Sequence, residues 1–181
     1  MKDRKLTKMV QMAVLSALAF ILILLIRFPI FPATPYLVYD PGDIPLLIGA
    51  FMFGPVSGII MAAVVSALQA LFLSGDGIVG FAMHLMASGA LVGVAGLIYR
   101  RFHTRRGALA ALICGTVAMG LVMIPANLIF TVHAYGVPYE TVMATMPFTV
   151  GFNLLKAGIN SVVVFLIYKP LSRYLRPQHS R

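Results

Sequence analysis

Charged side chains are scarce in this sequence. Only 10% of its 181 residues are Asp, Glu, Lys or Arg, whereas 60% are hydrophobic. A soluble domain usually carries about 25% charged residues, so this chain has too little polar surface to cover itself in water. Because a membrane-spanning helix needs roughly 20 apolar residues, about six spans use nearly the whole length. The composition predicts one integral membrane domain over residues 1–181, in contact with the lipid bilayer.

Cysteine and catalytic motifs are also lacking. The one cysteine, Cys114, lies inside an apolar run and excludes a disulfide framework or a cysteine metal site. The sequence has no His-Glu-x-x-His motif, no glycine-rich phosphate loop and no ATPase motif. We therefore expect no catalytic residues, no metal site, no cofactor and no ATPase activity of its own. Any energy that the protein uses must come from elsewhere.

Basic residues outnumber acidic ones by 14 to five, which gives a formal net charge of +9. Such a charge could indicate nucleic-acid binding, but that function needs a basic face on a folded domain. Here the basic residues stand at the ends of apolar runs. We therefore expect a membrane protein and no nucleic-acid partner.

Apolar runs between helix-breaking residues predict six transmembrane helices. The second is doubtful because its apolar part is short, bounded by Pro45 and by Gly54-Pro55, and must be extended by tilting or by loop residues. The first run is too long for the core of a signal peptide and has no clear cleavage site, so we interpret it as a span. The predicted spans are 10–26, 46–53, 56–73, 79–99, 108–132 and 148–168.

The basic residues also predict the orientation, because short cytoplasmic loops retain Lys and Arg. With six spans and a cytoplasmic N-terminus, Arg27 and Lys156 are the only basic residues outside the cytoplasmic segments. A five-span model or the inverted orientation puts at least one arginine cluster outside. The sequence thus predicts an all-α membrane protein, a six-transmembrane-helix bundle with both termini in the cytoplasm.

Two long outer segments suggest a site that opens outward. Residues 28–43 contain four prolines, too many for a helix, and residues 133–147 form the other predicted loop. Loops held by a rigid scaffold often carry function. Asp40 and Asp43 are too few for a dedicated calcium loop, so we interpret Asp43 as a cap of the following helix.

Lys156 is the strongest single signal for a binding site. It lies within a predicted apolar helix, where a charge costs a few kcal/mol unless it faces a polar cavity or a partner. Asn153, three residues earlier, shares its helix face, and the pair suits a neutral ligand with hydroxyl or carbonyl groups. The alternative is that the helix begins later and Lys156 reaches the outer interface.

Other polar residues interrupt the apolar runs. Asn127 follows Pro125, whose ring frees a backbone carbonyl and can bend the helix toward a cavity, but a buried asparagine equally suits a contact between helices. His84 suits a hydrogen bond to a neighbouring helix better than a ligand contact. Ala13 and Ala17 form a small-residue strip on the first helix that lets another helix approach, inside or outside the bundle.

Four motifs resemble the substrate-binding S components of energy-coupling factor (ECF) transporters, and among them the riboflavin-specific members. Two motifs are specific: Tyr-Asp-Pro-Gly-Asp-Ile-Pro at 39–45 leading into 46–55, and Phe-Asn-Leu-Leu-Lys at 152–156. The strip of Ala13 and Ala17 and the Gly-Leu-Ile-Tyr-Arg segment at 96–100 agree with them. Many such members carry an asparagine where this chain has His84.

The resemblance implies a subunit that captures riboflavin at its outer face for an ECF-type importer. It implies that Ala13 and Ala17 dock on a membrane coupling subunit attached to two ATPase subunits. It also implies ligand contacts from Asn127, Asn153 and Lys156 and from the first outer loop, namely Ala33, Thr34, Pro35, Tyr36 and Leu37. We add His84 to these candidate contacts. The alternatives are another vitamin or a flavin precursor as ligand, a membrane enzyme, and a channel or scaffold.

Overall fold

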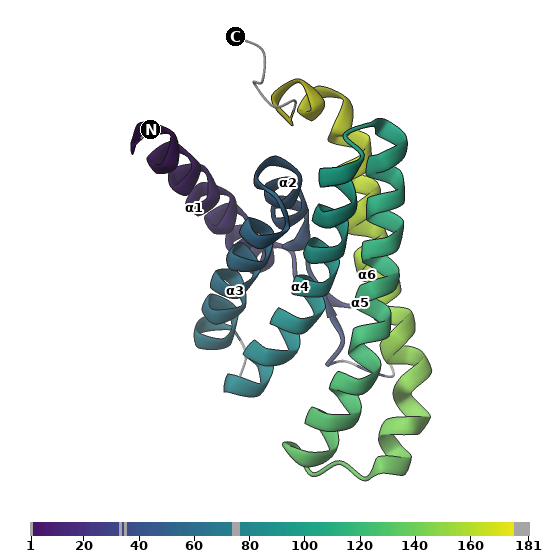
Figure 1. Ribbon diagram of the computed structural model, residues 1–181. Coiled ribbons are helices and arrows are strands. Elements are labelled where there is room, and N and C mark those ends of the chain that lie inside the picture. The colour runs from purple at the N-terminus through teal and green to yellow at the C-terminus, as the bar shows by residue number, and fades with distance from the viewer. Residues whose placement is uncertain (1, 33, 35, 74–76, 176–181) are drawn as a thin grey trace.

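The computed structural model describes residues 2–32, 34, 36–73 and 77–175, and helices dominate it (Figure 1). Two short strands pair antiparallel in the segment between the first two helices, with Phe28 opposite Tyr39. Apart from this ribbon, the regular structure of the described residues is all-α. The elements in chain order are α1 (Lys2–Leu25), β1 (Phe28–Pro29), β2 (Val38–Tyr39), α2 (Asp43–Phe53), α3 (Pro55–Phe72), α4 (Gly77–Arg101), α5 (Arg105–His133) and α6 (Tyr139–Leu175).

Five of these helices are long and apolar enough to cross a membrane, namely α1, α3, α4, α5 and α6. The sixth, α2, has only 11 residues. At a rise of 1.5 Å per residue it is about 16 Å long, roughly half the thickness of the hydrocarbon core. It already includes Asp43, Ile44 and Pro45, which precede the predicted span. The second helix is therefore too short to cross the hydrocarbon core by itself.

The predicted outer loop at 133–147 is wrong. α6 begins at Tyr139, so the connection to α5 is only residues 134–138. The Pro138 carbonyl accepts the first backbone hydrogen bonds of the helix, and Pro147 lies inside it. A proline removes one backbone donor, but the surroundings in a bundle can satisfy the freed carbonyl. The sequence break at Pro147 was therefore not a helix boundary.

The turns at the end of the bundle that carries both chain ends are tight. Gly54 joins α2 to α3 with a φ of 90°, in the left-handed region that favours glycine, and Pro55 follows as the first residue of α3. Thr104 caps α5, because its Oγ1 accepts a hydrogen bond from the Gly107 amide at 3.0 Å. These local signals define where three helices begin or end.

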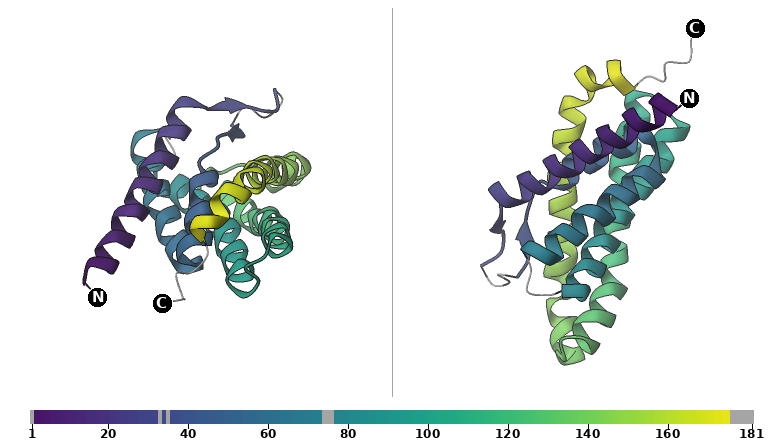
Figure 2. Two further views of the ribbon diagram at one scale, coloured as in Figure 1. Left: turned by 90° about the horizontal axis from the view of Figure 1, so that it is seen from above. Right: turned by 90° about the vertical axis from the view of Figure 1, so that its left-hand side faces the viewer.

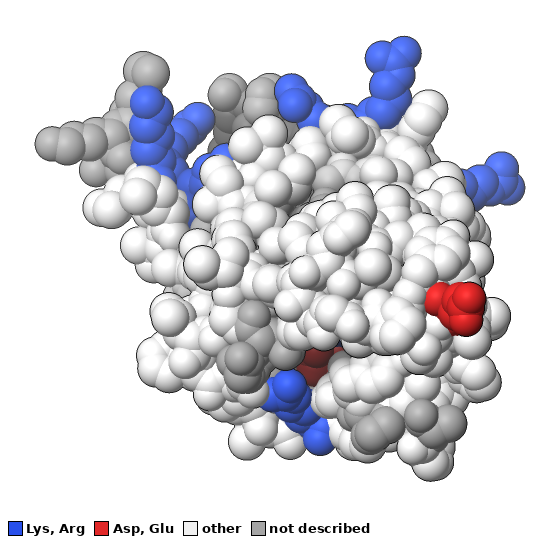
Figure 3. All heavy atoms as spheres, turned by 90° about the horizontal axis from the view of Figure 1, so that it is seen from below, with Lys and Arg blue, Asp and Glu red and all other residues white. Residues whose placement is uncertain are grey.

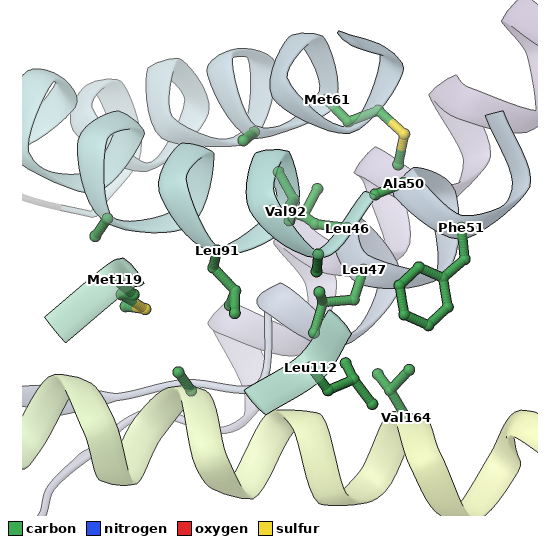
Figure 4. Close-up of a cluster of buried hydrophobic side chains, with 14 of the residues drawn as sticks. Leu46, Leu47, Ala50, Phe51, Met61, Leu91, Val92, Leu112, Met119 and Val164 are labelled. Carbon is green, nitrogen blue, oxygen red and sulfur yellow. The ribbon is translucent and has the colours of Figure 1, made fainter. Parts of the chain in front are cut away.

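The hydrophobic core is built around α2 (Figure 4). This helix contacts α1, α3, α4 and α6, and its Leu46 and Leu47 are fully buried. Leu91 of α4, Leu112 of α5 and Val164 of α6 pack into the same cluster. The helix that is too short to span alone is thus the most enclosed one.

The remaining helices surround this centre (Figures 1 and 2). α1 lies along one side against α2 and α3, while α5 and α6 form an antiparallel pair on the other side. Both described chain ends lie at the same end of the bundle, and the α5–α6 connection lies at the opposite end. Large apolar side chains are exposed along the outward faces, including Val14, Leu18, Val64, Leu121 and Leu166. A bilayer would cover such a surface.

Candidate functional site

A cavity of about 550 Å³ opens at the end of the bundle opposite the chain ends. Figure 3 looks onto this face and shows a hollow with acidic atoms at depth beside a basic side chain. Small-molecule sites typically enclose 300–1,000 Å³. The walls come from the segment between α1 and α2 and from α3, α4, α5 and α6. Residues far apart in the sequence therefore share one ligand-sized space.

The cavity wall combines aromatic and thioether side chains with a few polar ones. Tyr36 belongs to the segment between α1 and α2, Tyr135 to the α5–α6 connection and Phe152 to α6. Met119 and Met123 of α5 add adaptable apolar surface. Mostly apolar walls with a few polar groups are typical of sites for flat organic molecules.

Lys156 lies in this wall and is paired with Asp40. Its Nζ is 2.8 Å from Asp40 Oδ2, and the two side chains are 6% and 4% exposed. Lys156 is 17 residues into α6, so the alternative in which it reaches the outer interface is wrong. Desolvating two charges is costly and needs good geometry and further hydrogen bonds, and Asp40 Oδ1 accepts one from the Gly42 amide at 3.1 Å.

A buried hydrogen-bond network extends from this ion pair. Asn160 of α6 accepts a hydrogen bond from the Tyr39 hydroxyl at 2.9 Å and donates to the Asp40 carbonyl at 3.2 Å. Its amide also donates to Asp43 Oδ2 at 3.4 Å, and the Ser88 hydroxyl of α4 donates to Asp43 Oδ1 at 2.6 Å. The network connects the β2–α2 segment to both α4 and α6.

The predicted capping role of Asp43 is wrong. Gly42 occupies the position before α2, and the helix start has no side-chain cap. Asp43 is the first helical residue, and its carboxylate points to Ser88 and Asn160 instead. In the buried core, these tertiary donors compete successfully with the amides of its own helix.

Asn153 and Asn127 both line the cavity. Asn153 is 4% exposed, and its Nδ2 donates to the Thr149 carbonyl at 2.8 Å. Asn127 Nδ2 donates to the Met123 carbonyl at 2.8 Å, and its Oδ1 accepts from Thr131 at 3.3 Å. These partners of Asn127 belong to α5 itself, so the structure gives no support for a contact between helices. Both amides are anchored within their own helices and face the cavity.

His84 lines the cavity from α4, and only one of its two ring nitrogens has a hydrogen-bond partner among the described residues. Its Nδ1 lies 2.9 Å from the Ser66 hydroxyl of α3, which agrees with the predicted hydrogen bond to a neighbouring helix. Its Nε2 is buried and has no hydrogen-bond partner among the described residues. A buried polar atom without a partner is unfavourable, so this nitrogen is suited to a ligand.

The predicted first outer loop, between α1 and α2, reaches the cavity through Tyr36 and Leu37. Thr34 is buried, and its Oγ1 has no partner among the described residues. Ala33 and Pro35, also predicted as contacts, lie outside the described residues. Earlier in the loop, the Phe31 ring packs edge-on against the Phe148 ring of α6, with 6.2 Å between the two ring centroids. The loop therefore packs against the helix that carries Lys156.

Ala13 and Ala17 lie on α1, away from the cavity, and both are exposed. Of the two predicted possibilities, packing inside the bundle or outside it, exposure favours a contact outside this chain. Across the described residues, no group of three or more His, Cys, Asp or Glu side chains could hold a metal ion.

Asp40 and Asn160 were not among the predicted site residues. Asn160 follows Lys156 by one helical turn, so the spacing that linked Asn153 to Lys156 also indicates Asn160. Asp40 gave a weaker signal, because it is 116 residues from its partner in sequence. Only the fold brings these two charges together.

Comparison with protein families supports the sequence resemblance. Residues 7–168 match the family described as "ECF transporter, substrate-specific component". The chain is 31% identical over 149 residues to riboflavin transporter RibU of Staphylococcus aureus, covering 78% of each chain. It is 29% identical over 159 residues to riboflavin transporter FmnP of Bacillus subtilis, covering 80% of this chain and 82% of that one.

A solved structure has the same fold. It is described as the S component of a bacterial ECF transporter and superimposes with a TM-score of 0.81 at 32% sequence identity. The match covers 95% of this chain and 99% of that one. The similarity therefore includes the whole helical arrangement around the cavity.

Proposed function

Since this chain belongs to the family of substrate-specific components of ECF transporters, we propose that it captures riboflavin at the outer face of the membrane. As a member of that family it is an integral membrane protein and a transport subunit, not an enzyme. Two relatives named riboflavin transporters support the choice of ligand. The alternatives are another vitamin or a flavin precursor.

The observation that carries this proposal is the cavity and its chemistry. Its volume of about 550 Å³ suits a vitamin-sized molecule, and Tyr36, Tyr135 and Phe152 offer surfaces for a flat heteroaromatic ring. The Lys156 ammonium is already paired with Asp40. A neutral ligand with carbonyl and hydroxyl groups therefore fits better than an acid.

The proposed ligand contacts follow from the cavity wall. Asn127, Asn153 and Lys156 bind polar atoms of the vitamin, and His84 Nε2 supplies a further hydrogen bond. Tyr36 and Leu37 contact the vitamin from the first outer loop. Its neighbours Ala33, Thr34 and Pro35 complete the predicted contacts, and the loop acts as a lid. The Phe31–Phe148 contact supports this role, because it anchors the loop beside the cavity.

The proposed topology is six crossings in one domain over residues 1–181, with both termini in the cytoplasm of a multi-pass cell-membrane protein. Both described ends lie at one end of the bundle, as an even number of crossings requires (Figure 1). The α2 helix makes the second crossing together with the segment that precedes it. The distribution of basic residues supports the cytoplasmic assignment of that end.

The proposed partners are a membrane coupling subunit and two ATPase subunits, because this chain lacks an ATPase motif of its own. The exposed Ala13 and Ala17 of α1 are the proposed docking strip. Small side chains let a second helix approach closely in lipid, where packing drives association. Riboflavin is the transported ligand in this proposal, and no cofactor is required.

Titration of the purified protein with riboflavin tests the proposed ligand. Quenching of flavin fluorescence should saturate at or below micromolar concentration, because the cavity buries the ring. A panel of other vitamins and flavin precursors serves as the comparison. Absence of saturable binding at micromolar riboflavin, or tighter binding of another vitamin, would contradict the assignment.

Replacing Lys156 with Ala should weaken riboflavin binding at least about tenfold, about 1.4 kcal/mol. The change removes a charged donor and leaves the Asp40 carboxylate unpaired. Lys5→Ala, an exposed lysine at the other end of the bundle, is the control and should bind like the wild type. Equal affinities of the two variants, measured by the same quenching titration, would refute the Lys156 contact.

A further inference from the structure

We infer that Asp40 is a positioning and specificity-determining residue of the ligand site. It holds the Lys156 ammonium in place and cancels its charge, so that the site accepts a neutral ligand and rejects an anionic one. This inference rests on the proposed function, because it concerns the same cavity. It adds a charge filter to the proposed site.

The geometry leaves N–H donors of the Lys156 ammonium without a hydrogen-bond partner among the described residues. Its ammonium has three N–H groups, and one of them donates to Asp40 Oδ2 at 2.8 Å. Among the described residues, Nζ makes no other hydrogen bond. Both residues line the cavity, so the remaining donors can reach acceptor atoms of a ligand. Asp40 itself is held on its other oxygen by the Gly42 amide.

The charge balance at this end of the cavity is unfavourable for anions. Asp43 is a second buried carboxylate, and Asn160 bridges it to Asp40. Two carboxylates therefore accompany one ammonium. Arg27 also lines the cavity and keeps its positive charge, since its partner at 3.1 Å is the neutral Leu73 carbonyl; its side chain is exposed, however, so water screens that charge. An anionic group beside Lys156 would be desolvated without a buried, unpaired positive charge to compensate it.

A neutral acceptor meets no such penalty. A carbonyl or hydroxyl oxygen can accept from the spare N–H groups of Lys156 while the ion pair stays intact. Charged donors make hydrogen bonds roughly twice as strong as neutral ones. Asp40 thus keeps a strong donor in the site without making the site attractive to acids.

The test measures a ratio of dissociation constants, that of an anionic flavin over that of riboflavin. The probes are flavin mononucleotide, charged on its side chain, and a lumiflavin carrying a carboxylate on the ring, so both ends of the ligand are sampled. In the full-length protein, Asp40→Asn should lower this ratio about tenfold or more for at least one probe, one decade being about 1.4 kcal/mol. Glu140→Gln, an exposed carboxylate at the start of α6, should leave both ratios unchanged.

A second pair of variants covers the case in which Asp40→Asn alone does not fold, since it leaves a buried ammonium unpaired. Lys156→Met should raise the ratio above that of the wild type. Adding Asp40→Asn to Lys156→Met removes both charges and should lower the ratio again about tenfold. A purely structural ion pair predicts changed unfolding temperatures with constant ratios.

The outcomes separate the two proposals. If the wild type shows no saturable riboflavin binding, the proposed function fails. If the wild type binds riboflavin and both ratios stay constant on removal of the Asp40 charge, only the charge filter fails. If the ratio of dissociation constants falls equally for Asp40→Asn and for Glu140→Gln, the charge filter is also overturned, because that result indicates a long-range surface effect.

Discussion

Lys156 and His84 both present buried nitrogen atoms to the cavity, and these atoms differ in whether they have a hydrogen-bond partner. The Lys156 ammonium is paired with Asp40 at 2.8 Å. The His84 ring has one partner, Ser66, while its Nε2 has none among the described residues. Leaving a buried polar group unsatisfied costs about 1–3 kcal/mol. A suitable ligand atom at His84 Nε2 would therefore remove this cost.

Replacing Ser66 with Ala and His84 with Phe together should separate binding from stability. Riboflavin affinity should fall about 3- to 30-fold, roughly 0.7–2 kcal/mol, because the ligand loses one hydrogen bond. The unfolding midpoint without ligand should stay equal or rise, because both polar partners are replaced by apolar groups. Titration and thermal unfolding in detergent measure the two effects.

Ser66→Ala alone is the control for this pair, since it keeps the His84 ring in the cavity wall. It should retain more of the riboflavin affinity than the double variant. Wild-type affinity in the double variant, combined with a lower unfolding midpoint, would show that His84 serves structure alone.

At the scale of elements, close packing around α2 and α3 depends on small residues of the neighbouring helices. A Cβ added at Gly96 of α4 would lie 2.9 Å from the Pro55 Cα at the start of α3. That atom belongs to the backbone and cannot move aside as a flexible side chain can. The short α2–α3 turn thus sits directly against α4.

Gly96→Ala should therefore lower stability by about 1–3 kcal/mol, the usual cost of overpacking. Gly89→Ala on the same helix is the matched control, because its added Cβ would meet only the Leu85 Cδ1 at 3.8 Å. That change should be neutral or slightly stabilising, since Ala favours a helix over Gly. The difference between their thermal unfolding midpoints in detergent measures the effect, and equal midpoints would contradict the close contact.

At the scale of the whole molecule, the direction of the cavity determines what the protein can capture. In the proposed topology the α5–α6 connection faces outward and the α4–α5 turn faces the cytoplasm. Ala134 and His103 are exposed residues at these two places. They offer positions at which the orientation can be read directly.

Single cysteines at these positions, in a Cys114→Ala background, should react differently with a membrane-impermeant maleimide added to intact cells. Ala134→Cys should be labelled and His103→Cys should not, because the basic end of the bundle lies inside. Both should react after the cells are permeabilised. Labelling of His103→Cys in intact cells would reverse the proposed orientation.

Docking is the second property of the whole molecule. Ala13→Trp and Ala17→Trp should lower the yield of copurified coupling and ATPase subunits several-fold, because a bulky ring blocks close helix approach. Riboflavin affinity should not change, since α1 lies away from the cavity. Val117→Trp, an exposed position on α5, is the control and should copurify normally. Unchanged copurification of all three variants would exclude the alanine strip as the docking site.

The long helices could be predicted from the sequence alone, because a run of about 20 apolar residues has few other stable structures in a membrane. The same reasoning failed at Pro147, where a proline inside α6 was mistaken for the end of a loop. Proline lowers the helical preference locally, but it does not reveal whether the surrounding bundle will satisfy the freed carbonyl.

By itself, the sequence determined that the chain is an apolar helical protein with a polar face on its last helix. Lys156 and Asn153 stood out because a charge or amide in an apolar run needs a polar environment. Only the tertiary structure decided which environment that is. It placed Asp40, from a loop 116 residues away, against Lys156, and it directed Asp43 to Ser88 and Asn160. Such pairings depend on how the helices pack, which local residue spacing does not encode.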